Sequence, residues 1–370
     1  MKIPFVDLKS NFDQIKKEYL IRVDQILNDT SFIDGYYNRS FEDKFASLHD
    51  SKFGVSLSSG TAGNHMALRA LNIGVGDEVI LPANTFIATA WGITLCGATP
   101  VFVDVDPETF NIDSKQVEEK ITSNTKAIIA VHLYGLPAKM DALLRVGKKY
   151  GIPIIEDAAQ AHLAEFDSQK VGSFGKLSSF SFYPSKNLGA FGEAGAITTN
   201  SEELTLKIRK IINQGSESKY VHSELGTNYR LSHLIAASLD LKIPYLQEWT
   251  EARIRIANRY QNNLKDISNI NFQKVPSNCK AVYHLFVVQT QNRSDLQKHL
   301  NEKGISTGIH YPIPIHLQSI FNGKQGDCPI AEKLAQQTLS LPIYPNLTDS
   351  EVDYVCDRIR DFSMNKNIEV

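Results

Sequence analysis

Short apolar stretches alternate with helical patterns through the first half of the chain, and this alternation constrains the fold more than any other feature. The candidate strands are 53–57, 78–81, 99–103, 127–131, 152–155, 179–182 and 196–198. Several of them are apolar throughout, as expected of strands that helices cover on both faces. Helical patterns lie between them, at 64–71, 88–95 and 140–150. The sequence therefore predicts a wound, mostly parallel, seven-stranded α/β sheet.

The rest of the chain is expected to form a second, smaller lobe. We expect a strand at 283–288, a helix at 296–303, an extended segment over 305–315 and a last helix at 349–360. The pattern over 231–263 predicts one or two long helices that lead into this lobe, with a break allowed at Pro244. We expect a large domain over 31–244, a small α+β domain over 245–370, and an N-terminal segment, 1–30, that packs on the small domain.

Composition excludes several classes of protein. The chain has 370 residues, a formal net charge of -2 and no basic block, so nucleic acid is not an expected partner. No apolar run approaches the roughly 20 residues of a membrane span, and no secretory pattern begins the sequence. The cysteines are scattered without a CxxC spacing, and the His and Cys residues do not cluster at metal-ligand spacings. We therefore expect a protein of the reduced cytoplasm without a metal site.

Two of the predicted strands lead to charged side chains. The strand at 152–155 runs into Asp157, and the strand at 179–182 is followed by Lys186 and a glycine-rich segment. Taken singly, Asp157 would often be a surface acid or a helix cap, and Lys186 would usually be solvated. Together they match the needs of pyridoxal phosphate (PLP). This cofactor requires an amine for its covalent link, and a carboxylate that keeps its pyridine nitrogen protonated so that the ring accepts electrons.

A loop of small residues at 58–63 precedes a predicted helix and is a candidate phosphate site. Small residues let backbone amides approach an anion, and a helix N-terminus adds partial positive charge. Taken alone, an ordinary helix cap explains such a loop more often. Phe86 follows a strand and could stack on a planar ring, although a lone Phe is more often part of the core. The G-x-G-x-x-G dinucleotide pattern does not follow the early strands, which argues against a nicotinamide reductase.

Four motifs make the chain resemble the DegT/StrS family of PLP-dependent sugar-nucleotide aminotransferases. They are 59–61, 82–89, 156–162 and 181–189. The likeness runs from 3–8 to 339–345, which is nearly the whole chain. It implies the aspartate aminotransferase fold, known as fold type I, and an enzyme that transfers an amino group to a nucleotide-linked keto-sugar.

The resemblance also implies roles for single residues. Lys186 would be linked to PLP, and Asp157 would face the pyridine nitrogen. Phe86 would stack on the ring, and Gln160 would lie near its 3-hydroxyl. The phosphate would be held by Gly60, Thr61, Ala62 and Ser181. Asn228 would reach the phosphate of the neighbouring subunit, which implies a homodimer with shared active sites.

Two further segments, 214–222 and 308–318, resemble the subgroup that aminates C3 of a dTDP-linked 3-keto-6-deoxyhexose. The implied amino donor is L-glutamate, and the implied pathway makes amino sugars for lipopolysaccharide, S-layer or other glycans. The side chains expected on the sugar-nucleotide side are Tyr183, Tyr220, His310, Tyr311, His316 and Gln318. His and Tyr suit a substrate rich in hydroxyls that bears a diphosphate. From the residues alone, 308–318 is more simply interpreted as a rigid surface loop.

Several positions depart from the usual family pattern, namely Leu136, Leu163, Ser185, Glu193 and Ile235. None of them removes a cofactor group, so they leave the sugar and the aminated carbon open. A 4-keto sugar or a UDP-linked sugar is the alternative acceptor. A catalytically silent regulator is the alternative of another class, and the intact Lys186 and Asp157 argue against it. Dehydratases of this fold carry His in place of Lys186, which disfavours dehydration.

Overall fold

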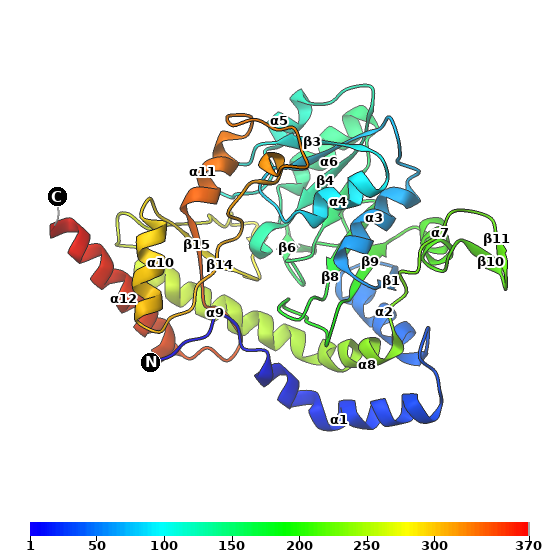
Figure 1. Cartoon of the computed structure of the whole chain (residues 1–370), viewed down its shortest axis with the longest axis horizontal. Coiled ribbons are helices and arrows are strands. Elements are labelled where there is room, and N and C mark those ends of the chain that lie inside the picture. Colours follow the sequence, from blue (N-terminus) through cyan, green and yellow to red (C-terminus); the bar gives the residue numbers. More distant parts are fainter. Residues whose placement is uncertain (369–370) are drawn as a thin grey trace.

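The computed structural model describes residues 1–368 and contains one large sheet between helices, with a smaller sheet beside it (Figure 1). The large sheet has seven strands in the order β1-β9-β8-β5-β4-β2-β3. They are β1 (Phe53–Leu57), β2 (Glu78–Pro82), β3 (Thr99–Val103), β4 (Thr125–Val131), β5 (Ile154–Asp157), β8 (Leu177–Ser181) and β9 (Gly195–Thr199). Strand β9 is antiparallel to both of its neighbours, and the other pairs are parallel. The predicted α/β sheet is therefore confirmed.

Both faces of the sheet are covered, which explains why its strands are apolar throughout. In β2, Val79 and Leu81 pack into the core that the sheet shares with α3 and α4. Ile80 points the other way, into a core that includes Leu143 and Val146 of α6. Because side chains alternate along a strand, consecutive residues enter two different cores. The helices of this part are α2 (Tyr36–Leu48), α3 (Gly60–Ala70), α4 (Ala88–Leu95), α5 (Ser114–Glu119), α6 (Met140–Tyr150) and α7 (Glu202–Ile212).

The C-terminal part has its own antiparallel sheet and its own core. Its strands, in spatial order, are β12 (Asn271–Phe272), β14 (Phe286–Gln289) and β15 (Thr338–Leu341). Its helices are α10 (Arg293–Glu302), α11 (Pro329–Gln337) and α12 (Asp349–Ile368). Two helices lead into it, α8 (His233–Lys242) and α9 (Leu246–Leu264), and the turn η2 (Ile243–Tyr245) separates them. Of the two alternatives for this stretch, the structure has two helices with the break at Pro244, whereas the division into two domains at residue 245 stays a prediction.

Smaller elements lie at the periphery. The hairpin of β10 (Ser216–Ser218) and β11 (Val221–His222) projects from the body of the molecule (Figure 1). A second small sheet contains β6 (Glu165–Phe166), β7 (Gln169–Lys170) and β13 (Cys279–Lys280). Two single 3-10 turns are η1 (Leu133–Gly135) and η3 (Ile315–Leu317). Across the described residues, none of the helices is long and apolar enough to cross a membrane.

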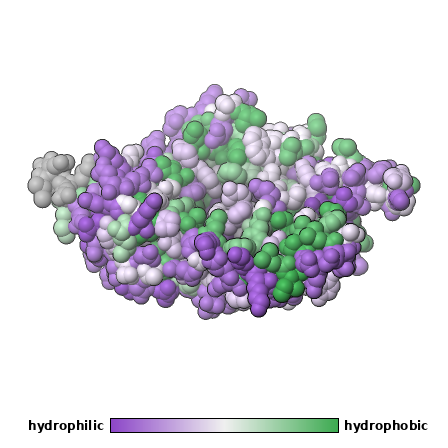
Figure 2. Space-filling view, turned by 60° about the horizontal axis from the view of Figure 1, so that its bottom comes forward, coloured by the Kyte–Doolittle hydropathy of each residue, from purple (hydrophilic) through white to green (hydrophobic). Residues whose placement is uncertain are grey.

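The N-terminal helix α1 (Lys9–Asn28) has most of its contacts with α8, and the expected packing of the whole segment 1–30 on a small domain stays a prediction. It lies along α8, within the segment 31–244, because buried Asp240 of α8 pairs with Arg22 of α1 at 2.7 Å. The segment 245–370 is contacted by Ile3, which pairs with Ile305 ahead of the helix, and by Gln14 of α1, which accepts a hydrogen bond from Trp249 Nε1 at 3.2 Å. Three apolar side chains of α1 remain exposed, namely Leu20, Ile21 and Leu27, and Figure 2 shows a hydrophobic area on the face that it brings forward. Such a surface is typical of contact with another protein chain.

Candidate active site

A cavity of about 450 Å³ lies at the edge of the large sheet where its parallel strands end. Val131 ends β4, Asp157 ends β5 and Ser181 ends β8, and all three line the cavity. The first turn of α3 forms another part of the wall. The carboxyl edge of an open parallel sheet is the usual place for a ligand, because the loops there diverge and leave a crevice.

Asp157 is buried in the wall of this cavity, and three hydrogen bonds fix its carboxylate. Its Oδ2 accepts from Asn64 Nδ2 at 2.9 Å and from Thr89 Oγ1 at 2.8 Å. Its Oδ1 accepts from the amide of Ala159 at 3.2 Å. Hydrogen bonds to a charged acceptor are stronger than neutral ones. The carboxylate is therefore held in one orientation beside the cavity.

Lys186 enters the cavity from the loop that follows β8. The loop turns tightly, since a Cβ on Gly189 would lie 2.1 Å from the carbonyl oxygen of Pro184. The lysine side chain is half-buried, and the surrounding protein removes enough water to lower the pKa of its amine to about 8, against the opposing effect of Asp157. An amine with this pKa is partly uncharged near neutral pH, so it can act as a nucleophile and as a base.

The N-terminus of α3 provides an anion site opposite Ser181. Ser59 caps the helix by accepting a hydrogen bond from the amide of Ala62 at 3.1 Å. A Cβ on Gly60 would lie 2.7 Å from the Cβ of Ser181, so only glycine lets the helix approach β8 this closely. Gly60, Thr61 and Ser181 line the cavity, while Ala62 is buried behind them. The helix dipole and the free amides of the first turn favour an anion here.

The facing wall carries aromatic and polar side chains. Gln160 accepts from the amide of Tyr134 at 2.6 Å and donates to the hydroxyl of Tyr311 at 3.0 Å. His310 Nδ1 lies 2.8 Å from Ser340 Oγ, and burial together with the charge of Lys186 lowers the pKa of His310 to about 4. Phe86 lines the cavity with its ring centroid 5.5 Å from that of Tyr311. Neutral imidazole and phenol groups therefore face the lysine.

Five of the predicted site residues do not line this cavity, namely Ala62, Tyr220, Asn228, His316 and Gln318. Tyr220 is 85% exposed at the tip of the β10–β11 hairpin. Asn228 is also exposed and pairs with Asn213 through its backbone. His316 is buried with its Nε2 3.1 Å from Glu332, and Gln318 directly follows the turn η3. The structure therefore does not bring His316 and Gln318 to the lysine, because the pairing with Glu332 fixes this stretch elsewhere.

The structure adds residues to the site that the sequence analysis missed. They are Asn64 and Thr89, which bind Asp157, and His284, which lines the cavity. Ser59 of the predicted 58–63 loop and Glu193 also line it. Asn64 and Thr89 lie on helices that follow strands, a position that could have drawn attention to them. His284 has no such sequence signal, because it reaches the cavity from the C-terminal part of the chain.

The residues of the cavity fit PLP. This cofactor carries an aldehyde, a ring nitrogen and a phosphate, and the cavity offers Lys186, Asp157 and the α3 N-terminus. A cavity of about 450 Å³ is in the usual range for cofactor sites. Within residues 1–368, no group of three or more His, Cys, Asp or Glu side chains is arranged to hold a metal ion.

Comparisons with known proteins agree with this geometry. A model of the DegT/DnrJ/EryC1/StrS aminotransferase family matches residues 13–360. A pleiotropic regulatory protein of Geobacillus stearothermophilus is 42% identical over 368 residues, which cover 98% of this chain and 99% of that protein. A UDP-N-acetyl-3-dehydro-alpha-D-glucosamine 3-aminotransferase of Acidithiobacillus ferrooxidans is 43% identical over 359 residues, 97% of each chain.

A dTDP-3-amino-3,6-dideoxy-alpha-D-galactopyranose transaminase of Aneurinibacillus thermoaerophilus is 41% identical over 361 residues, which cover 97% of this chain and 99% of that protein. Among solved structures, DesV of S. venezuelae superposes with a TM-score of 0.96 and 38% identity, covering 98% of each chain. The likeness to these proteins therefore extends over both the large sheet and the C-terminal part.

Proposed function

This chain belongs to the DegT/DnrJ/EryC1/StrS aminotransferase family and is a PLP-dependent sugar aminotransferase, and from this premise we propose its substrates and the roles of its residues. We propose that it transfers the amino group of L-glutamate to C3 of a dTDP-linked 3-keto-6-deoxyhexose. The observation that carries the chemistry is the presence, in one cavity, of a fixed carboxylate, Asp157, and an amine of lowered pKa, Lys186.

The proposed roles follow from the positions of the side chains. Bound PLP supplies an electron sink and carries the amino group between the two substrates. Lys186 provides the amine for the covalent link, takes a proton from the donor's α-carbon, and returns a proton to the sugar carbon. Asp157 keeps the ring nitrogen protonated, and the first turn of α3 holds the phosphate. L-glutamate and the keto-sugar thus become 2-oxoglutarate and the amino sugar.

Support for C3 comes from the relatives and from the cavity wall. The names of two relatives specify nitrogen at C3 of the sugar. One of these names specifies dTDP and the other UDP, so our choice of dTDP depends on the segments 214–222 and 308–318. His310 and Tyr311 of the second segment line the cavity that contains Lys186. A purely regulatory role has less support, because Lys186 and Asp157 are both in place.

We expect the 3-keto acceptor to react far better than its 4-keto isomer. The cavity can present one sugar carbon to the cofactor, and a shift of about 1 Å can cost on the order of 10²-fold in rate. The measurement is kcat/KM for 3-keto and 4-keto sugars on dTDP and on UDP, with product NMR to locate the nitrogen. A better rate with the 4-keto sugar would overturn the choice of C3, and a better rate with UDP would overturn the choice of dTDP. Neither result would affect the assignment as an aminotransferase.

We also propose a homodimer in which each active site receives Asn228, and Tyr220 of the projecting hairpin, from the other subunit. The support is that both residues are exposed and lie outside the cavity of their own chain. An isologous dimer exchanges such a segment in both directions.

Mixing two inactive variants tests the shared site. In a heterodimer of Lys186→Ala and Asn228→Ala subunits, one site carries both changes and the other carries neither. Equal mixing with random exchange should therefore restore about a quarter of wild-type activity. Mixing Lys186→Ala with Asp157→Asn is the control, because both changes lie in one chain's own cavity and no site of that heterodimer is intact. Absence of recovery despite demonstrated subunit exchange would contradict the shared site.

A further inference from the structure

A second cavity, of about 340 Å³, adjoins the one that contains Lys186. The two cavities share Tyr183, Ser185, His284 and His310 as lining residues. Most of the other side chains around the second cavity are apolar, and Arg253 is the one charged side chain among the described residues that line it. The active site is therefore continuous with a small, largely apolar compartment that contains a single cation.

Arg253 is buried and has no acidic partner. Its Nη1 donates to the carbonyl oxygens of Tyr283, His284 and Ile343 at 3.1 to 3.4 Å, while its Nε has no hydrogen-bond partner. Burial lowers the pKa of the guanidinium to about 10, so the group stays charged at neutral pH. Within the described part of the chain, no Asp or Glu lies within ion-pair distance of it.

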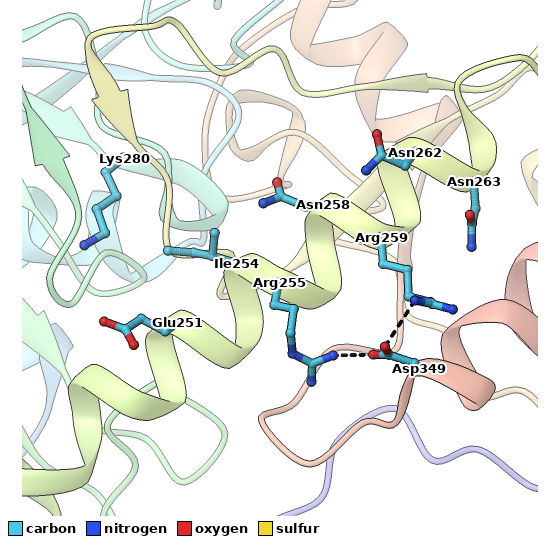
Figure 3. Close-up of a pocket in the computed structure, with 9 residues that line it drawn as sticks. All are labelled: Glu251, Ile254, Arg255, Asn258, Arg259, Asn262, Asn263, Lys280 and Asp349. Atoms are coloured by element: carbon cyan, nitrogen blue, oxygen red, sulfur yellow. Dashed lines mark hydrogen bonds and ion pairs between the residues drawn. The ribbon is translucent and has the colours of Figure 1, made fainter.

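The other arginines of α9 show that this arrangement is unusual for the helix. Arg255 and Arg259 point to the outer face and both pair with Asp349, as Figure 3 shows, and Arg259 also pairs with Asp353. These exposed cations would cost little to leave unpaired, yet they have carboxylate partners. A buried and unpaired charge is much more costly, so a ligand that supplies an anion would stabilise Arg253 strongly.

The position of Arg253 relative to Lys186 indicates which anionic group of a ligand would bind Arg253. Besides burial, the charges of both Lys186 and Arg253 lower the pKa of His284, which places the imidazole near both cations. The cofactor phosphate has its own site at the N-terminus of α3. The α-carboxylate of an amino donor is attached to the reacting carbon, so it must stay in the main cavity beside Lys186. A carboxylate at the far end of the donor's side chain would reach into the adjoining cavity.

We infer that Arg253 binds the side-chain carboxylate of the amino donor and so selects a dicarboxylic amino acid. This inference rests on the proposed aminotransferase function and adds a residue that distinguishes L-glutamate from its amide. A guanidinium has the donors to bind a carboxylate through two parallel hydrogen bonds. The apolar walls exclude competing water, which strengthens the pairing.

The test compares L-glutamate with L-glutamine in the first half-reaction, followed by the absorbance of the holoenzyme's cofactor. In Arg253→Gln, the preference for glutamate should fall on the order of 10- to 100-fold, because one charge-assisted contact is lost. Arg255→Gln is the matched control on the same helix and should keep the wild-type preference. Arg253→Lys retains the charge and should recover part of it. A purely structural role would slow both amino acids equally, and an unchanged preference would overturn the inference.

Two further measurements extend the test. The first needs no variant, and the second needs no turnover. The wild-type holoenzyme must itself prefer L-glutamate to L-glutamine, and equal rates would overturn the inference without any variant. Titration calorimetry with glutarate, a dicarboxylate that cannot react, should give at least tenfold weaker binding to Arg253→Gln than to wild type. Equal binding would contradict a carboxylate site at Arg253. If neither amino acid changed the cofactor's absorbance, the proposed function would fail, while the glutarate titration would still decide the role of Arg253.

Discussion

Lys186→Ala should fold and bind PLP without a covalent link, and it should show no measurable aminotransferase turnover. The substitution removes both the amine that forms the link and the group that moves the proton. Loss of a general base alone typically costs 10²- to 10⁴-fold, and the missing nucleophile adds to this, so we expect a loss on the order of 10⁴-fold or more. Borohydride reduction of the wild-type protein followed by peptide mapping should find the cofactor fixed to Lys186.

Lys242 provides a matched control for the mapping of the borohydride-fixed cofactor. Its amine is also buried and also has a pKa lowered to about 8, but it donates to the carbonyl oxygen of Gly189 at 2.7 Å and lies over the ring of Phe191. A low pKa by itself would make both lysines candidates, whereas only Lys186 lines the cavity with Asp157. Recovery of the reduced cofactor on Lys242, or on any lysine other than Lys186, would refute the assignment.

Asp157→Asn should lose activity on the order of 10²-fold or more and keep its fold. The amide oxygen can still accept from Asn64 and Thr89, but a neutral group no longer stabilises a protonated ring nitrogen. Removal of one preorganised electrostatic group has an effect of this size in other enzymes. The measurements are kcat for the full reaction and the melting temperature of each protein. Turnover close to that of wild type would contradict the role of Asp157.

The adjacent acid is the control for this experiment. Glu156 is fully buried and accepts hydrogen bonds from the amides of Gly172, Phe174 and Gly175 and from the hydroxyl of Ser178. Glu156→Gln replaces one of these acceptor atoms with a donor, and an unsatisfied buried group costs about 1–3 kcal/mol. We therefore expect Glu156→Gln to melt at a lower temperature and to keep a higher kcat than Asp157→Asn.

These two acids also mark how far the sequence could predict the site. The apolar stretches predicted all seven strands of the sheet, because strands buried on both faces need apolar residues at consecutive positions. The ends of two strands then indicated an acid and the amine of Lys186, and the resemblance to the family implied that the acid is Asp157. The pattern could not separate Glu156 from Asp157, since alternate residues point to opposite faces and only the tertiary structure shows which face contains the cavity.

The sequence alone could not predict contacts between distant parts of the chain. His284 and Arg253 reach the site from the C-terminal part, and neither belongs to a local pattern that indicates a ligand. The contact of helix α1 with α8 could not be seen in the sequence for a similar reason, because Asp240 of α8 and Arg22 of α1 are far apart along the chain. His316 looked like a substrate ligand because of its neighbours in the motif, whereas its imidazole is paired with Glu332.

The walls of the cavity around Arg253 have a consequence for the order in which the protein can assemble. Phe5 lines it from near the start of the chain and Ile343 from near the end, whereas the strands that lead to Asp157 and Lys186 all lie between residues 53 and 199. Domains fold as units while the ribosome is still adding residues, and contacts of large sequence separation form slowly. A nascent chain therefore contains Asp157 and Lys186 well before it can close the compartment around Arg253.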